Sequence, residues 1–184
     1  MKLLLITLTI LQSLLATLEQ KTLVSAFAIS ITDQQAQPTT YTGDLAIHGK
    51  QFPLSMFAIE AAYDGNTLYM YSDDTEELSL STPTEEELLQ TNPFLYAQAL
   101  LPVCQYTEKA IGDKTQITLT PNDPSSGITK FVLRFTTSTL LPTSVEIHED
   151  GGQTTTLRFN NARYTNDTPS FVIEKEGAYI NDLR

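Results

Sequence analysis

Apolar and polar residues alternate along most of this chain, and this period of two decides which folds are open to it. Side chains of a β-strand point alternately to its two faces, so each alternating segment has one apolar and one polar face. Such strands are typical of an antiparallel sheet that is dry on one side and wet on the other. The alternating apolar residues are Phe27, Ile29 and Ile31; Leu45 and Ile47; Phe52, Leu54 and Met56; Ile117 and Leu119; Phe131, Leu133 and Phe135; Val145 and Ile147; Leu157 and Phe159.

Turn sequences separate these segments at short intervals. Asp64-Gly65 predicts a two-residue hairpin, and His48-Gly49 and residues 150–152 have the composition of further turns. Ten or eleven short strands fit this spacing, which predicts a large curved sheet or a partial barrel. With 184 residues, the chain is long enough for one domain, residues 1–184, with a sizeable core.

Two short helices are predicted to interrupt the strands. Thr82-Pro83-Thr84-Glu85 fits a capping box with Pro83 at the first helical position, followed by the apolar pair Leu88 and Leu89. Asn92 is predicted to cap a second helix that Pro93 opens. Because a large concave sheet needs a cover for its dry face, we expect these helices to lie over it.

The N-terminal segment combines two patterns. Residues 1–8 have the one Lys and the apolar run of a secretory signal, and the run is too short for a confident transmembrane span. From about Thr9 onward, Leu11, Leu14, Leu15 and Leu18 follow the spacing of an amphipathic helix. We therefore expect a helix there, after a signal-like start.

Charge and motif content exclude several functions. The net charge is −11, and no Lys or Arg occurs between Lys50 and Lys109, so nucleic acid is not expected as a partner. The sequence contains no nucleophile, zinc, phosphate-loop or dinucleotide motif, and we expect neither a catalytic site nor a metal nor a cofactor. His48 and His148 are expected to be solvated, as are the acidic residues of 73–77. The single Cys104 is expected to be a small buried residue on a strand.

The apolar face leaves two interpretations open. Its side chains could fill a core, which is the more usual arrangement, or they could line a cavity. The residues by themselves do not decide between the two.

The order of the elements resembles the LolA-like family of periplasmic outer-membrane lipoprotein carrier proteins, particularly the branch typical of Bacteroidetes. Each matching segment is weakly specific alone, but their order extends over most of the chain. These segments are LQSLLATLEQ followed by Ser25-Ala26-Phe27; Thr42 to Leu54; Tyr63 to Tyr71; Glu76-Glu77-Leu78; Pro83 to Glu87; Asn92-Pro93; Leu141 to Val145; and Ile180 to Arg184.

The resemblance implies an α+β fold that is mostly antiparallel β, an incomplete, half-open β-barrel of about 11 strands with a lid of short α-helices. It implies a monomeric, non-enzymatic periplasmic chaperone that binds acyl chains of lipoproteins in a hydrophobic cavity. Its partners would be acylated lipoproteins, an inner-membrane ABC transporter of the Lol type and an outer-membrane acceptor. The expected cavity lining is Phe27, Ile29, Leu45, Ile47, Phe52, Leu54, Phe131, Leu133 and Phe135, and the expected lid residues are Leu88, Leu89, Phe94 and Leu95.

One position departs from the family. Well-studied members have an Arg in the hairpin near Ile47 to Lys50 that helps to hold the lid, whereas here the turn reads His48-Gly49-Lys50. Lys50 lacks the planar fork of donors of an Arg, so we do not expect it to replace that contact. Two other functions stay open: a periplasmic lipid-sensing module of envelope-stress signalling, and a lipid-modifying enzyme, which the missing catalytic motifs disfavour.

Overall fold

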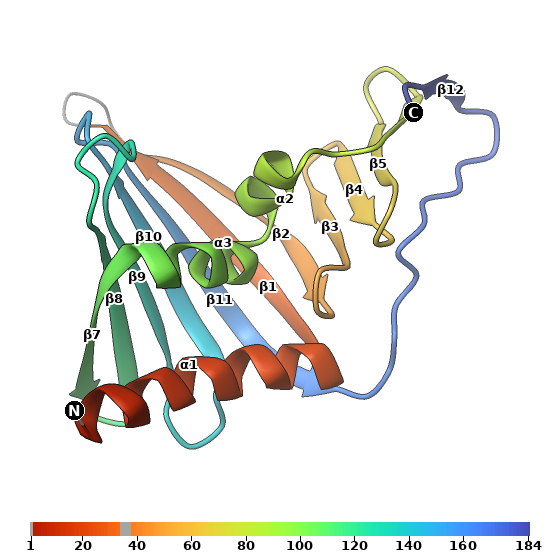
Figure 1. Ribbon diagram of the computed structural model, residues 1–184. Coiled ribbons are helices and arrows are strands. Elements are labelled where there is room, and N and C mark those ends of the chain that lie inside the picture. Colours follow the sequence, from red (N-terminus) through yellow and green to blue (C-terminus); the bar gives the residue numbers. More distant parts are fainter. Residues whose placement is uncertain (1, 34–37) are drawn as a thin grey trace.

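The computed structural model describes residues 2–33 and 38–184, and within these ranges it describes the side chains from residue 10 onward (Figure 1). Its helices are α1 (Lys2–Gln20), α2 (Glu85–Thr91) and α3 (Pro93–Leu100), and a short 3-10 helix, η1, follows at Leu101–Val103. Its strands are β1 (Thr22–Thr32), β2 (Thr39–Ile47), β3 (Phe52–Met56), β4 (Ile59–Tyr63), β5 (Leu68–Ser72), β6 (Glu77–Ser81), β7 (Cys104–Ile111), β8 (Lys114–Pro121), β9 (Ile128–Thr136), β10 (Pro142–Glu149), β11 (Thr154–Thr165) and β12 (Tyr179–Asp182).

The described strands form one open, strongly curved sheet in the order β12-β6-β5-β4-β3-β2-β1-β11-β10-β9-β8-β7. Neighbouring strands are antiparallel, except that β12 runs parallel to β6. The predicted half-open barrel is confirmed, with twelve strands where the sequence predicted about eleven. Apart from β12, strands that follow one another in the sequence are neighbours within each half of the sheet, β1–β6 and β7–β11, and the pairing of β1 with β11 joins the two halves.

The inner, concave face of the sheet carries the alternating apolar residues. Directly opposed residues of antiparallel strands point to the same face. Leu133, Val145, Leu157 and Ile29 are opposed in this way across four strands, and Tyr41 of β2 continues the row. Phe27 continues a second row between Phe159 and Gly43. These rows form the apolar wall of the barrel.

Helix α1 closes the lower end of this wall in Figure 1. Leu11 and Leu14 are fully buried and Leu18 is nearly so, whereas Gln12 and Glu19 are exposed. The predicted amphipathic helix is therefore present, but it begins at Lys2 instead of near Thr9 and includes most of the segment predicted as a signal-like start. Among the described residues, no helix has both the length and the apolar character needed to span a membrane.

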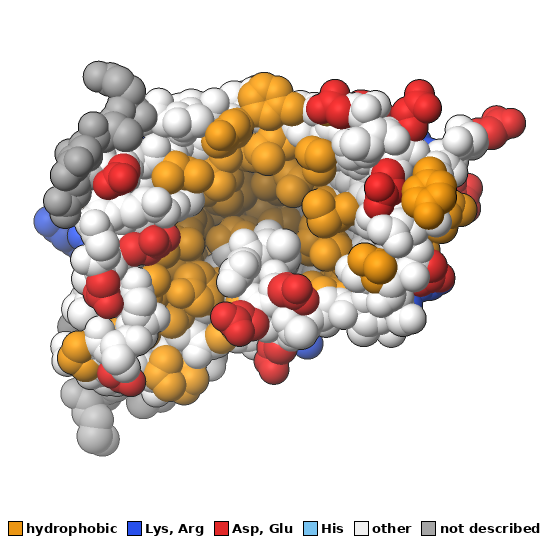
Figure 2. Space-filling view, turned by 90° about the horizontal axis from the view of Figure 1, so that it is seen from above, with side chains coloured by type: hydrophobic (Ala, Val, Ile, Leu, Met, Phe, Trp, Pro, Cys, Tyr) orange, Lys and Arg blue, Asp and Glu red, His pale blue; other side chains and the backbone are white. Residues whose placement is uncertain are grey.

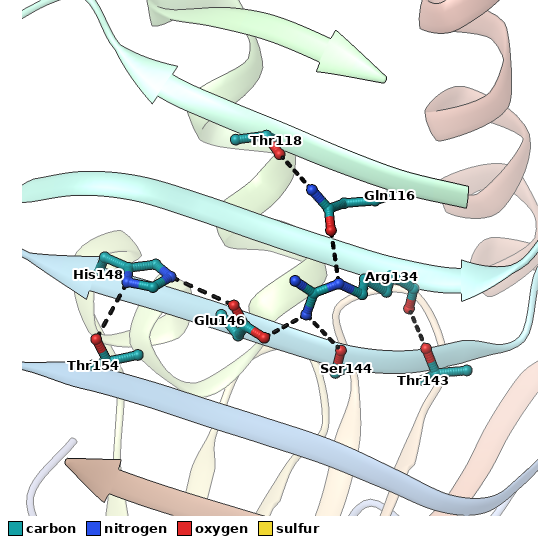
Figure 3. A network of polar contacts seen from close by, with 8 residues as sticks. All are labelled: Gln116, Thr118, Arg134, Thr143, Ser144, Glu146, His148 and Thr154. Carbon is teal, nitrogen blue, oxygen red and sulfur yellow. Dashed lines mark hydrogen bonds and ion pairs between the residues drawn. The ribbon is translucent and has the colours of Figure 1, made fainter. Parts of the chain in front are cut away.

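The outer face of the wall is polar and cross-linked (Figure 3). Arg134 of β9 donates from Nε to Gln116 of β8 at 2.8 Å and forms an ion pair with Glu146 of β10. His148 lies 3.5 Å from the Glu146 carboxylate, and its Nδ1 is 3.2 Å from Thr154 of β11. Burial opposes the charge of Glu146, but Arg134 and His148 together outweigh it, so the pKa of Glu146 is lowered. The network ties four long strands together.

Candidate functional site: an apolar hollow beneath a helical lid

The concave face is hollowed at the end of the barrel opposite α1. Figure 2 looks into this hollow and shows hydrophobic side chains over its floor and acidic side chains around its rim. Helices α1 and α3 pack against the lower part of the concave face. The apolar face is therefore a packed core where these helices cover it and an open surface above them. Both interpretations left open by the sequence therefore apply, each to one end of the barrel.

The change from core to hollow can be followed along single strands. On β1, the inward-facing Leu23 and Phe27 are buried, whereas Ile29 and Ile31 are half-buried. On β11, Phe159 is buried and Leu157 is half-buried. The inward-facing side chains thus become more accessible toward the mouth of the hollow.

The structure divides the predicted lining residues between these two environments. Leu45 and Leu54 are half-buried and border the core, and Ile29 is half-buried at the hollow. Phe27 is buried over Gly43, where a Cβ would lie 2.9 Å from the Phe27 ring and 2.0 Å from the backbone oxygen of Ser55. The predicted lining residues that belong to the packed core are Ile47, Phe52, Phe131, Leu133 and Phe135.

Four further inward-facing residues were not among the predicted lining. Ile31, Tyr41, Ile147 and Leu157 are half-buried and stand opposite other inward-facing residues of the wall. Ile31, Ile147 and Leu157 belong to the same alternation, which could have identified them. Tyr41 lies on a strand rich in Thr, where the alternation is weak.

The two lid helices are attached to the wall with very different strength. Helix α3 buries Phe94, Ala97 and Leu100. Phe94 stacks on Phe159 and Tyr96 meets Phe131 edge to face, with ring centroids 5.8 Å apart in both pairs. Aromatic pairs of this kind add about 0.5–1.5 kcal/mol beyond their buried area. The predicted lid residue Phe94 is thus part of the core, and Leu95 is half-buried.

Helix α2 rests on the mouth with no buried residue among its seven, all of which the structure describes. Leu88 and Leu89 are half-buried. Glu85 to Glu87 are exposed in the first turn, where their negative charges interact favourably with the helix dipole. Its capping box is formed by Thr84 and Glu87, so the prediction of Thr82 and Glu85 is wrong by two residues. Helix α2 contacts the core through the half-buried Leu88 but buries no side chain of its own, and its capping box stabilises its first turn.

Four titratable side chains of the lid and the wall, one Cys and three Tyr, are in surroundings that favour their neutral form. Burial raises the pKa of the Cys104 thiol, the Tyr96 phenol and the Tyr164 phenol. Burial and the neighbouring Glu108 carboxylate raise the pKa of Tyr106. Cys104 begins β7, as predicted, but it is half-buried against the core and not buried. None of these four side chains adds a charge to the wall at neutral pH.

Two pockets lie outside the hollow. One, of about 250 Å³, lies between α1 and α3, and its lining includes Leu15, Glu19, Gly49 and Leu95. The other, of about 470 Å³, lies on the outer face between β2–β4 and the described segment 170–175, which Lys175 fixes through a 2.6 Å ion pair with Glu60.

A protein-family model described as "Outer membrane lipoprotein carrier protein LolA" matches residues 19–173 of this chain. No curated protein matches the sequence. An uncharacterized conserved protein from Thermus thermophilus superposes with a TM-score of 0.62 at 10% identity, covering 93% of this chain and 98% of that one. This likeness shows a shared fold.

Two further solved structures are more distant. A LolA superfamily protein from Nitrosomonas europaea gives a TM-score of 0.42 at 12% identity, over 86% of this chain and 94% of that one. The MucA/MucB complex of Pseudomonas aeruginosa gives 0.46 at 14% identity, over 88% of this chain and 58% of the matched one.

Proposed function

Because this chain belongs to the family of outer membrane lipoprotein carrier proteins, we propose that it is a periplasmic carrier that holds the acyl chains of lipoproteins in its apolar hollow. It would take them from an inner-membrane ABC transporter of the Lol type and deliver them to an outer-membrane acceptor. The proposed carrier acts as a monomer and without catalysis.

The observation that carries this proposal is the half-buried apolar surface at the mouth. Ile29, Tyr41 and Leu157 are inward-facing and remain partly accessible. Transfer of an acyl chain from water to such a surface is worth about 0.8 kcal/mol for each buried CH₂ group. A hollow that covers part of a chain can therefore hold it against water and still release it to a membrane acceptor.

The attachment of the lid supports release as well as binding. A carrier must exchange cargo, so part of its cover has to move at low cost in free energy. Helix α2 covers the mouth without a buried residue among those described, whereas α3 and α1 keep the lower part closed. Loading and release can thus proceed without unfolding the core.

The proposal is tested by a release assay. Purified protein is added to inner-membrane vesicles that contain a Lol-type transporter and a labelled triacylated lipoprotein, and lipoprotein in the supernatant is measured with and without ATP. We expect ATP-dependent release as a one-to-one complex, which native mass spectrometry identifies, and transfer of the label to outer-membrane vesicles. Absence of both release and complex would refute the carrier, and a stable lipid complex without release would favour the sensor module.

A further inference from the structure

The turn between β2 and β3 is the point where three elements meet. The backbone N–H of Gly49 donates to the Leu18 carbonyl at the end of α1, at 2.7 Å. Its carbonyl accepts a hydrogen bond from Nδ2 of Asn92, at 3.2 Å. Gly49 has a φ of +56°, and a Cβ there would lie 2.8 Å from the Glu19 carboxylate. One backbone unit thus connects α1, the hairpin and the lid.

Asn92 uses its polar groups on both sides of the junction between α2 and α3. Its backbone N–H donates to the Leu88 carbonyl, at 3.1 Å, and ends α2. Its Oδ1 accepts from the backbone N–H groups of Phe94 and Leu95, at 3.1 and 3.3 Å, and caps α3. The residue is fully buried. A buried amide without partners would cost free energy, so this set of hydrogen bonds is what permits Asn92 to lie here.

The two helices therefore differ in what holds them. Helix α3 is fixed to the core by Phe94 and to the hairpin through Asn92, while α2 buries none of its described side chains and contacts the core through the half-buried Leu88. We propose that Asn92 is the positioning residue that holds α3 as the fixed floor of the hollow, so that α2 alone pivots at residue 92 to admit cargo. The movement of α2 rests on the proposed carrier function, and the anchoring of α3 does not.

This arrangement explains how the lid can be held although the hairpin has no Arg. Here the donor is a side chain of the lid and the acceptor is the backbone of the hairpin, the reverse of a contact made by a hairpin side chain. A backbone carbonyl is present whatever residue occupies the turn. The sequence His48-Gly49-Lys50 is consequently compatible with a fixed lid floor, provided that Asn92 is kept.

Hydrogen–deuterium exchange of the cargo-free protein tests the anchor. In the parent we expect amides of 94–100 to be better protected than those of 85–91, because α3 buries three side chains and α2 buries none. Asn92→Asp keeps an acceptor for the α3 cap but cannot donate to Gly49, so protection of 94–100 should fall at least about tenfold. Lys50→Ala is the control for a hairpin side chain, and it should leave the exchange of 94–100 unchanged.

Two results would overturn the proposal. One is equal protection of 85–91 and 94–100 in the parent, and the other is a loss in Lys50→Ala as large as in Asn92→Asp. If Asn92→Asp does not fold, Asn92→Ser replaces it, since a Ser hydroxyl can cap α3 but is too short to keep the bond to Gly49. Because exchange is measured without cargo, a failed anchor is distinguished from a failed carrier, which the lipoprotein release assay reports separately.

Discussion

A carboxylate placed in the hollow should block acyl binding at neutral pH and largely spare it in mild acid. The substitution is Ile29→Glu, at an inward-facing position that is half-buried in the empty protein. Without cargo the new carboxylate can reach water, so the fold should persist. A charge at Phe52 would instead disrupt the core, because Phe52 is 4% exposed and packs against Tyr63.

The magnitude follows from the cost of making the new carboxyl neutral. An acyl chain over residue 29 removes water, and neutralising a Glu with an ordinary pKa costs about 4 kcal/mol at pH 7, or roughly 500-fold in affinity. At pH 5 the same step costs about 1 kcal/mol, roughly fivefold. Ile29→Gln should weaken binding by a similar factor at both pH values, since its amide does not titrate.

The assay is fluorescence titration with a labelled diacylated cysteine peptide that contains no charged residue. Thr42→Glu is the matched control: Thr42 is exposed on the outer face of the neighbouring strand β2, so it should bind like the parent at both pH values. Parent-like binding by Ile29→Glu at pH 7, or a loss that does not depend on pH, would show that acyl chains do not lie against Ile29.

The other predictions concern the fold. Gly43→Ala should lower the free energy of unfolding, measured in urea, by about 2–3 kcal/mol, because its Cβ would lie 2.0 Å from a backbone oxygen. Gly151→Ala is the control and should leave the stability unchanged, because a Cβ at Gly151 would meet nothing within 4 Å. Equal effects of the two substitutions would refute the close approach at Gly43. Leu14→Ala should cost about 3 kcal/mol, because this fully buried side chain of α1 leaves a cavity, and a loss below about 1 kcal/mol would mean that α1 is not part of the core. Glu146→Gln should cost about 1 kcal/mol at pH 7 through loss of the Arg134 pair. Because the pKa of Glu146 is lowered in the folded state, its contribution to stability is present above the ordinary pKa of 4.5 and is lost as the pH falls below that value. Urea titrations should therefore show a smaller acid-induced loss of stability in Glu146→Gln than in the parent.

The alternation of apolar residues predicted the sheet well because the period of two is set by the strand backbone itself. Leu133 and Val145 were assigned to the dry face from spacing alone, and they stand opposite each other on the concave wall. Asn92 and Pro93 likewise predicted the start of α3 correctly, because capping depends on neighbouring residues. Local rules of this kind can be read from a sequence.

Where the sequence offers two possible capping boxes for α2, it does not show which one forms. Both Thr82 with Glu85 and Thr84 with Glu87 have capping-box spacing, and the structure uses the second pair because residues 82–84 leave the sheet before α2 begins. Thr84 has the extended backbone of an N-cap, with a φ of −68° and a ψ of 163°, and its side chain accepts from the backbone N–H of Glu87.

The Asp64-Gly65 turn shows the same difficulty. The predicted hairpin is present, but the connection between β4 and β5 extends from Asp64 to Thr67 and is longer than the two residues predicted. The Asp64 carboxylate accepts from the backbone N–H groups of Asn66 and Thr67, both at 2.8 Å, and stabilises the longer loop.

The division of the apolar face into core and hollow depends on where α1 and α3 come to rest. Phe131 and Ile147 are opposed on neighbouring strands and have similar sequence surroundings, yet Phe131 is fully buried under Tyr96 and Ile147 is half-buried. The alternation of apolar residues does not predict this difference in burial. Contacts distant in sequence produce it, as they also produce the bond between Asn92 and Gly49.

The pairing of β1 with β11 has a consequence for how fast this protein can fold. These neighbours at the seam of the sheet are joined only after nearly all of the intervening chain has been synthesised, since Thr22 stands opposite Thr165. Closing so large a loop costs entropy before any contact repays it, so sheets dominated by distant pairings fold slowly. Until β11 is synthesised, the edge of β1 that pairs with it has unpaired backbone N–H and C=O groups, and such an edge is prone to aggregation. A protein proposed to protect acyl chains from water would thus itself need protection from aggregation during its synthesis.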